Sequence, residues 1–312
     1  MHESFEYTPG AALRPYVERA VGYLHSGLAA GTHVGMPSGS LTLVVPLDEP
    51  LTLSRERDGA RTPFDSVVAG LDAAPTHIHH RGHQHGLQLA LRPDAARALL
   101  GCRPADLAGE SYEWSDVFGT TAASLRDRLH GITDWTGRFA ALESLLVARL
   151  VDAPGPQAEV AQAWCLVEAS GGRLPVREVA RRVGWSLRQL EKQFRAEYGL
   201  SPKTVAIVRR FERSVSMVSR GRHGLADIAA ACGYSDQAHL ARDWRTLAGL
   251  PPSRWAVEDV LAGTATREVS EDSMASKAPT RQRHSPRTFG PVGSQGGTMG
   301  WEQSTTFGGS IE

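Results

Sequence analysis

Five histidines lie within a ten-residue stretch of this chain, and imidazole is the commonest metal ligand among protein side chains. The stretch is Thr76–His85, and its histidines are His77, His79, His80, His83 and His85. Side chains alternate between the two faces of a β-strand, so on a strand His77 and His79 would share a face, as would His83 and His85. Such a set could bind zinc, copper or nickel.

Two interpretations of this stretch stay open. No Asp or Glu lies within it, and the HExxH zinc pattern is absent from the chain. The simpler interpretation is a solvated loop that enters a strand at Gly86, and we adopt it, predicting no metal ligand. The alternative is a metal-binding enzyme or metal sensor that uses the histidines between 77 and 85.

The rest of the chain shows no sign of catalysis. It has no glycine-rich nucleotide-binding motif, no phosphate-binding loop and no nucleophile paired with a base. We therefore predict that the protein is not an enzyme, with no catalytic residue and no cofactor.

An internal repeat in the second half of the chain is more informative. Its first copy, Val179–Ser186, has the sequence VARRVGWS, and its second, Ile228–Ser235, has IAAACGYS. In both, a β-branched residue and an alanine precede the glycine by five and four positions, and an aromatic residue and a serine follow it. The second copy carries one extra residue before the leucine that follows.

This pattern predicts two helices joined by a tight turn. The alanine allows close approach of a second helix, and Gly184 or Gly233 can end the first helix in the left-handed conformation. Ser186 and Ser235 can cap the next helix, and Asp236 is an alternative cap in the second copy.

The residues after each serine predict how the second helix packs. Leu190 and Phe194 are four residues apart and share a helix face, as do Leu240 and Trp244. Packing of these faces leaves the opposite face free to enter a DNA major groove, as in a helix-turn-helix unit. The alternative is a pair of helical hairpins in an adaptor that never contacts DNA.

Residues 157–257 resemble the tandem helix-turn-helix domain of AraC/XylS-type regulators. The resemblance includes the end signature GLPPSRW at Gly249–Trp255 and its counterpart GLSP at Gly199–Pro202. A long connecting helix is expected from Pro202 to about Ser219. The resemblance implies that double-stranded DNA is the partner, with two recognition helices in successive major grooves roughly 34 Å apart.

The resemblance also implies candidate DNA-binding residues. In the first recognition helix, Ser186–Glu197, the matching base-facing positions are Arg188, Glu191 and Lys192. In the second, Asp236–Leu247, they are Gln237, Ala238, His239 and Arg242. Ser186 and Ser235, at the helix starts, complete the predicted set.

Side-chain chemistry suggests a base for several of these residues. Arg188 and Arg242 can form bidentate hydrogen bonds with guanine, and Gln237 can do so with adenine. Glu191 can accept a hydrogen bond from cytosine, whereas Ala238 offers only methyl contact.

Other charged residues near the two helices leave alternatives open. Glu191 is repelled by phosphate unless it finds its base, and it could pair instead with Arg188 or Arg195. Asp243 adds an acidic group to the second recognition helix. Five arginines are either phosphate contacts or solvated surface: Arg181, Arg182, Arg195, Arg209 and Arg210.

The elements around these motifs predict an α+β protein. Residues 1–153 form a mixed N-terminal domain, with strands at 41–47 and 86–91 and helices at 93–101 and 135–151. The sequence ProGlyPro at 154–156 marks a boundary before an all-helical domain at 157–260. The tail at 262–312 is rich in Ser, Thr, Gly and Pro, and we expect it to be disordered.

The N-terminal domain more loosely resembles the domain found at this position in many AraC-like regulators. The resemblance includes Leu13–Val17, Pro37–Gly39 and the stretch from His85 to Gly101. It implies a sensory or dimerisation domain, which leaves a small-molecule effector, a homodimer and contact with RNA polymerase open.

Composition agrees with a DNA-binding half. Residues 171–256 hold 16 Lys and Arg against 7 Asp and Glu, although the whole chain has a net charge of zero. No apolar run is long enough to span a membrane and no secretory signal is visible, so we expect a cytoplasmic protein with no membrane partner. The three cysteines are odd in number and far apart, and we expect each to be a small buried core residue.

Overall fold

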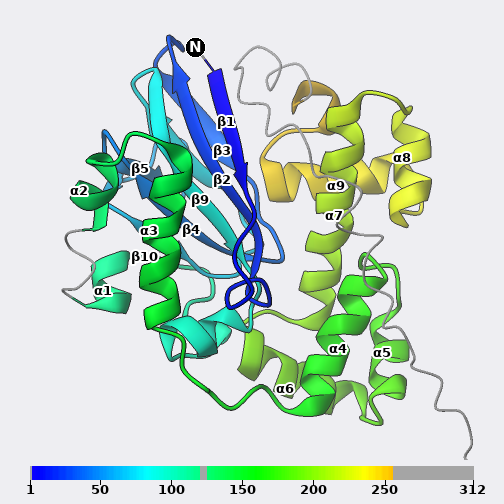
Figure 1. Cartoon of the computed structure of the whole chain (residues 1–312). Helices are drawn as coiled ribbons and strands as arrows, with labels where there is room; N and C mark the ends of the chain where they lie inside the picture. The colour runs from blue at the N-terminus through cyan, green and yellow to red at the C-terminus, as the bar shows by residue number, and fades with distance from the viewer. Residues whose placement is uncertain (1, 120–124, 256–312) are drawn as a thin grey trace, which may run out of the picture. The chain divides into compact units, whose positions relative to one another are not determined.

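A computed structural model describes residues 2–119 and 125–255, which form a strand-rich part followed by a helical part (Figure 1). The described strands form two antiparallel sheets, with strand orders β1-β2-β9-β4-β7-β10 and β3-β8-β5-β6. The larger sheet contains β1 (His2–Tyr7), β2 (Val17–Ser26), β9 (His83–Leu91), β4 (Leu41–Pro46), β7 (Val67–Ala69) and β10 (Ser111–Glu113). The smaller contains β3 (Gly31–Gly35), β8 (Thr76–His80), β5 (Leu51–Ser54) and β6 (Thr62–Phe64).

Strand β4 is almost continuously apolar because both of its faces are buried. Leu43 and Val45 pair with Leu89 and Leu87 of β9, and all four belong to the main hydrophobic core. Val44 points to the other face, where it packs with residues of both sheets, among them Leu53 and Val67. A strand covered on both faces loses the alternation of polar and apolar residues.

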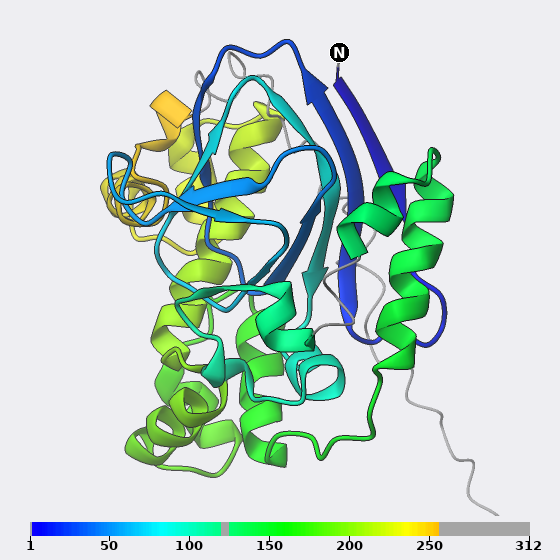
Figure 2. The same cartoon turned by 90° about the vertical axis from the view of Figure 1, so that its left-hand side faces the viewer.

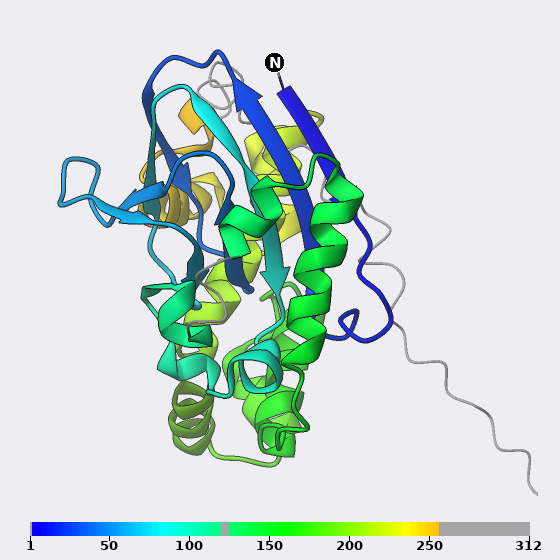
Figure 3. The same cartoon turned by 60° about the vertical axis from the view of Figure 1, so that its left-hand side comes forward.

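Helices cover the outer face of the larger sheet (Figures 2 and 3). They are the π-helix η1 (Ala96–Leu100), the 3-10 helix η2 (Pro104–Asp106), α1 (Trp114–Phe118), α2 (Leu125–His130) and α3 (Trp135–Ala148). Helix α3 begins at Asp134, whose side chain accepts a hydrogen bond from the Gly137 amide. Phe139, Leu142 and Leu146 of α3 are buried in the main core.

The helical part consists of α4 (Ala158–Ala169), α5 (Val176–Arg182), α6 (Leu187–Tyr198), α7 (Pro202–Arg220), α8 (Leu225–Cys232) and α9 (Gln237–Ala248). Helices α4 to α6 share a core in which Trp164 packs on Phe194 and Tyr198. Helices α7 to α9 share a second core, in which Trp244 packs on Phe211 and Trp255. None of the helices in the described ranges is long and apolar enough to cross a membrane.

Most predicted elements are present, and the α+β class is confirmed. The predicted strand at 41–47 is β4, and the predicted helix from Trp135 ends at Ala148 rather than at 151. The helix expected at 93–101 is shorter, since only Ala96–Leu100 is helical before Gly101 adopts the left-handed conformation. The tail at 262–312 lies outside the described residues.

Two local predictions are wrong. The histidine-rich stretch is not a loop, because residues 76–80 form β8 and β9 begins at His83, three residues before Gly86. Residues 76–80 are a strand because they pair with β3 and β5, and β9 begins at His83 because it pairs with β2. These partners are distant in the sequence, so local patterns did not predict them. Among the cysteines, Cys232 is buried as expected, whereas Cys165 is exposed and Cys102 is half-buried.

Candidate nucleic-acid interface

The first copy of the repeat folds as two helices around a glycine turn. Helix α5 ends before Gly184, which has a φ of +76°, and the Trp185 amide donates to the carbonyl oxygen of Ala180 at 3.0 Å. The Ser186 side chain caps α6 by accepting a hydrogen bond from the Gln189 amide at 3.2 Å. The predicted turn and cap are therefore confirmed in this copy.

Helix α6 has one buried and one exposed face. Leu190 and Phe194 are fully buried, as their spacing predicted. The three candidates for base contact are all exposed on the other side: Arg188, Glu191 and Lys192. The candidate side chains therefore lie on the solvent-exposed face of the helix, opposite its buried face.

The second copy has the same design with a different cap. Gly233 ends α8 with a φ of +80°, and Asp236 caps α9 by accepting from the His239 amide at 2.7 Å. Ser235 is not the cap, since its hydroxyl lies 3.2 Å from the Asp236 carboxylate and 3.2 Å from His239 Nδ1. The extra residue in this copy moves the start of the helix by one position, so the alternative cap is the correct one.

Helix α9 exposes three of its four candidate residues. Gln237, Ala238 and Arg242 are exposed, whereas His239 is half-buried, with its ring 5.1 Å from that of Tyr234. The internal contacts of His239 with Tyr234 and Ser235 hold its ring against the protein.

The acidic residue of α9 faces inward. Asp243 Oδ2 lies 3.9 Å from His239 Nε2 and 4.0 Å from the guanidinium of Arg210, and its side chain is 17% exposed. Burial raises the pKa of this carboxyl and outweighs the attraction of the nearby cations. Asp243 therefore does not present its charge on the exposed face of the helix.

Helix α7 connects the two units and fixes the second. Ser214 of α7 is fully buried, and its hydroxyl oxygen accepts a hydrogen bond from Trp244 Nε1 of α9 at 2.8 Å. Ser214 also donates to the carbonyl oxygen of Phe211 at 2.7 Å. Trp244 is itself fully buried, so this bond ties α9 to the connecting helix inside the core.

Two of the five arginines are internal, which corrects the phosphate-or-surface prediction for them. The Arg209 side chain is 12% exposed and forms ion pairs with Glu168 and Glu212. The Arg210 side chain is 19% exposed and lies over the ring of Tyr234. Their position on the inner side of α7 could not be inferred from charge alone.

The other three arginines of this group are exposed. Arg181 and Arg182 both pair with Glu178 within 2.8 Å, and their hydrogen bonds lower the pKa of Glu178 to about 2. Arg195 is exposed on α6. Within the described ranges, Glu191 forms no ion pair with Arg188 or Arg195, so its carboxylate stays on the exposed face.

These two units, each with an apolar inner face and a polar outer face, define a helix-turn-helix protein. Residues 179–257, about a quarter of the chain, match the family model described as a helix-turn-helix domain. The domain is of the AraC type, and the match supports a DNA-binding transcription regulator.

Several solved structures are similar to this chain. Apo ToxT K231A from Vibrio cholerae has 9% sequence identity and a TM-score of 0.49, covering 76% of this chain and 97% of that one. An AraC-type regulator from Chromobacterium violaceum has 26% identity and a TM-score of 0.30, covering 32% and 90%. The DNA-binding domain of AdpA, in complex with a target DNA, has 19% identity and a TM-score of 0.31, covering 33% and 94%. No curated protein sequence matches the chain.

Proposed function

We propose that this protein regulates transcription by binding a specific sequence of double-stranded DNA with α6 and α9 in successive major grooves. The observation that carries the proposal is the repeated design of the two helices. Each buries a Leu and an aromatic residue against the domain and exposes polar side chains on the other face. Helix-turn-helix proteins use such an exposed face to contact base edges.

The exposed residues assign a chemistry to each half of the DNA site. On α6, Arg188 contacts guanine and Glu191 contacts cytosine, with Lys192 adding positive charge. On α9, Gln237 contacts adenine and Arg242 contacts guanine.

The remaining candidates have smaller roles in this proposal. Ala238 makes methyl contact with a thymine, and Ser186 and Ser235 lie at the helix starts, where hydroxyl groups can donate to phosphate. His239 contributes only after its ring leaves Tyr234, so we assign it the weakest base contact of the set.

The strand-rich part has the sensory or dimerising role in this proposal. Its partners are a small-molecule effector, a second copy of the chain and, on DNA, RNA polymerase. An effector controls DNA binding only if its affinity differs between two arrangements of the protein. Such a regulator works in the compartment that holds the DNA, which is the cytoplasm of a bacterial cell.

Selection of DNA ligands from a random pool by the full-length protein tests this function. The selection is done at about physiological salt, where nonspecific phosphate binding is weakened. We expect a motif of two blocks whose centres lie about 10 base pairs apart, one per recognition helix. If the full-length protein enriches no motif, the selection is repeated with residues 157–260 alone. Failure of both to enrich a motif would contradict specific DNA binding and favour the adaptor or metal-enzyme hypothesis.

Charge-matched variants then test the residue assignments. We expect Arg188→Ala to relax the preference in one block only, and Arg242→Ala to relax it in the other, each by about 1–3 kcal/mol. Arg57→Ala, in the exposed turn between β5 and β6, removes the same charge and is the matched control. Equal losses for all three variants would indicate nonspecific attraction instead of base recognition.

A further inference from the structure

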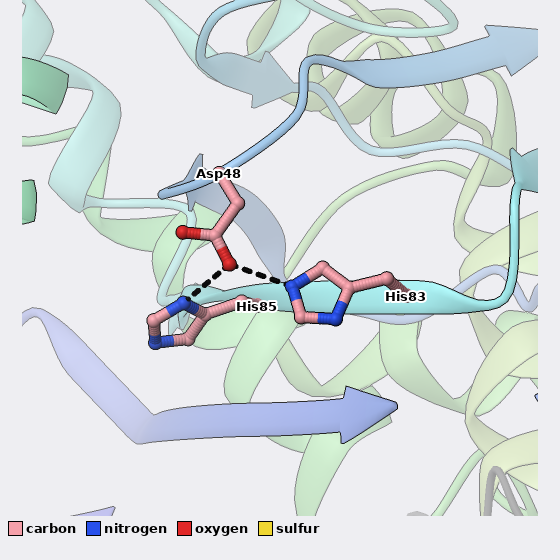
Figure 4. Close-up of side chains that lie close together, drawn as sticks. All are labelled: Asp48, His83 and His85. Carbon is pink, nitrogen blue, oxygen red and sulfur yellow. Dashed lines mark hydrogen bonds and ion pairs between the residues drawn. The ribbon is translucent and has the colours of Figure 1, made fainter. Parts of the chain in front are cut away.

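Asp48 joins two of the histidines on the strand-rich part (Figure 4). Its Oδ2 atom lies 2.6 Å from His83 Nε2 and 2.8 Å from His85 Nδ1. The three donor atoms lie within 4.8 Å of one another. The missing acidic residue of the histidine-rich stretch is therefore supplied from a distant part of the sequence.

The sheet places these three residues together. His83 and His85 alternate on β9 and so share a face, and Asp48 follows β4, the strand that pairs with β9. The amide of Leu47 donates to the carbonyl oxygen of His85 at 2.8 Å, which holds the two segments in register. Backbone pairing thus positions all three side chains before any ligand is present.

The cluster is accessible and has a neighbouring fourth donor. The side chains of His83 and Asp48 are 36% and 30% exposed, and that of His85 is 12% exposed. His130, at the end of α2, places its Nδ1 atom 3.6 Å from Asp48 Oδ1, and its side chain is 63% exposed. An ion can therefore reach the cluster from solvent and find three or four donor atoms.

We propose that Asp48, His83 and His85 bind a divalent transition-metal ion of the zinc class. Two imidazole nitrogens and one carboxylate oxygen suit Zn²⁺, Co²⁺ or Ni²⁺, whereas Mg²⁺ and Ca²⁺ prefer all-oxygen ligands. Water or His130 completes the coordination. This proposal does not depend on DNA binding, since the ion binds to the strand-rich part.

Metal binding replaces the protons that now lie between the rings and the carboxylate. Ligand atoms around a tetrahedral zinc ion lie about 3.3 Å apart, given bonds of about 2.0–2.1 Å, so each ring must move away from Asp48 by about half an ångström. His83 accommodates the ion by moving its proton from Nε2 to Nδ1. The partial exposure of His83 and Asp48 leaves room for this adjustment.

At His85, Arg138 opposes the corresponding move of the ring proton from Nδ1 to Nε2. Its guanidinium is buried, donates to His85 Nε2 at 3.0 Å, and also donates to the carbonyl oxygen of Ile132 at 2.7 Å. A donor at Nε2 keeps the His85 proton on Nδ1, where it points at Asp48, and a neutral ring cannot bind metal through a protonated nitrogen. Metal binding therefore requires Arg138 to release His85, which couples the ion to α3.

Metal titration of the untagged, chelator-treated full-length protein tests the site. Co²⁺ is added at neutral pH and followed by its visible absorption, and Zn²⁺ is then added as a competitor, with Mg²⁺ as the hard-ion comparison. We expect one equivalent of Co²⁺, displaced by Zn²⁺ and unaffected by Mg²⁺. His83→Gln and Asp48→Asn should abolish binding, whereas His77→Gln, in the same histidine-rich stretch but on β8, should leave it unchanged.

The Arg138→Gln variant tests whether Arg138 opposes metal binding by His85. A glutamine carbonyl oxygen can accept a hydrogen bond from Nε2–H of His85, the arrangement that supports metal-bound histidines, so affinity should rise about tenfold or more. Absence of Co²⁺ binding tighter than about 10 μM in both the wild type and this variant would overturn the proposal. Equal loss of binding in His77→Gln and His83→Gln would also overturn it, because the ion would then belong to the wider histidine-rich stretch.

Discussion

Replacement of Ser214 by alanine tests how the second recognition helix is held. The hydroxyl of Ser214 is the acceptor for Trp244 Nε1–H at 2.8 Å, and both side chains are fully buried. Ser214→Ala removes the acceptor and leaves an indole N–H without a partner inside the core.

The expected loss of stability in Ser214→Ala follows from the unsatisfied indole N–H of Trp244. A buried polar group that loses its partner destabilises the folded state by about 1–3 kcal/mol. Since 1.4 kcal/mol is about a factor of ten in an equilibrium constant, local opening of α9 should become about 5 to 150 times more frequent. The accompanying loss of the Ser214 bond to Phe211 is a local contact within α7 and adds little.

Hydrogen–deuterium exchange of the full-length protein measures this opening helix by helix. We expect the amides of α9 to exchange about 5 to 150 times faster in Ser214→Ala. The amides of α5 and α6 belong to the other core and serve as an internal reference. Local readout is preferable here, because a chain with several cores need not unfold in one transition.

Ser219→Ala is the matched control on the same helix. The Ser219 hydroxyl donates to the carbonyl oxygen of Val215 at 3.0 Å, which resembles the local bond that Ser214 makes. We expect the exchange of α9 to stay close to that of the wild type in this variant. Equal exchange of α9 in the two variants would refute the view that the Ser214–Trp244 bond holds the helix.

Three further predictions concern the recognition helices. Leu190→Ala should destabilise the first unit by about 2–5 kcal/mol, because Leu190 is fully buried. Leu187→Ala should change its stability by less than about 0.5 kcal/mol, because Leu187 is 45% exposed. Hydrogen–deuterium exchange of the α6 amides compares the two variants. Asp236→Ala should destabilise α9 by about 1 kcal/mol and Ser235→Ala by less, since Asp236 is the cap, and faster exchange in Ser235→Ala would contradict this assignment. The raised pKa of Asp243 means that its protonated form favours folding, so its contribution to the free energy of unfolding is present at acid pH and is lost as pH rises through that pKa. Asp243→Asn should lack this pH-dependent loss of stability, which thermal unfolding at a series of acid pH values measures. A pH profile equal to that of the wild type would count against the burial effect assigned to Asp243.

Local sequence patterns predicted the turns and the buried and exposed faces of the two helix-turn-helix units. Each helix-turn-helix unit depends on residues within about one turn of each other: an alanine, a glycine, a cap, and apolar residues four apart. The burial of Leu190 and Leu240 and the exposure of Arg188 and Arg242 could therefore be predicted. The error in the second cap is also local, since two adjacent residues could each have served.

Charge was a weaker guide than apolar spacing. Arg209 and Arg210 are in the most basic part of the chain, yet both lie against acidic or aromatic partners inside the helical part. Asp243 is likewise turned inward. A charged residue can lie on a surface or in an internal pair, and its type alone does not distinguish the two.

By itself, the sequence determined the α+β class, the two repeated units and the faces of α6 and α9, because these depend on helical periodicity and on capping residues close together in the chain. Tertiary structure alone decided the histidine-rich region. Strand pairing converts an expected loop into β8 and the start of β9, and it brings Asp48 to within hydrogen-bonding distance of His83 and His85. These partners are 35 and 37 residues from Asp48, so only the register between β4 and β9 could place the carboxylate between the two rings.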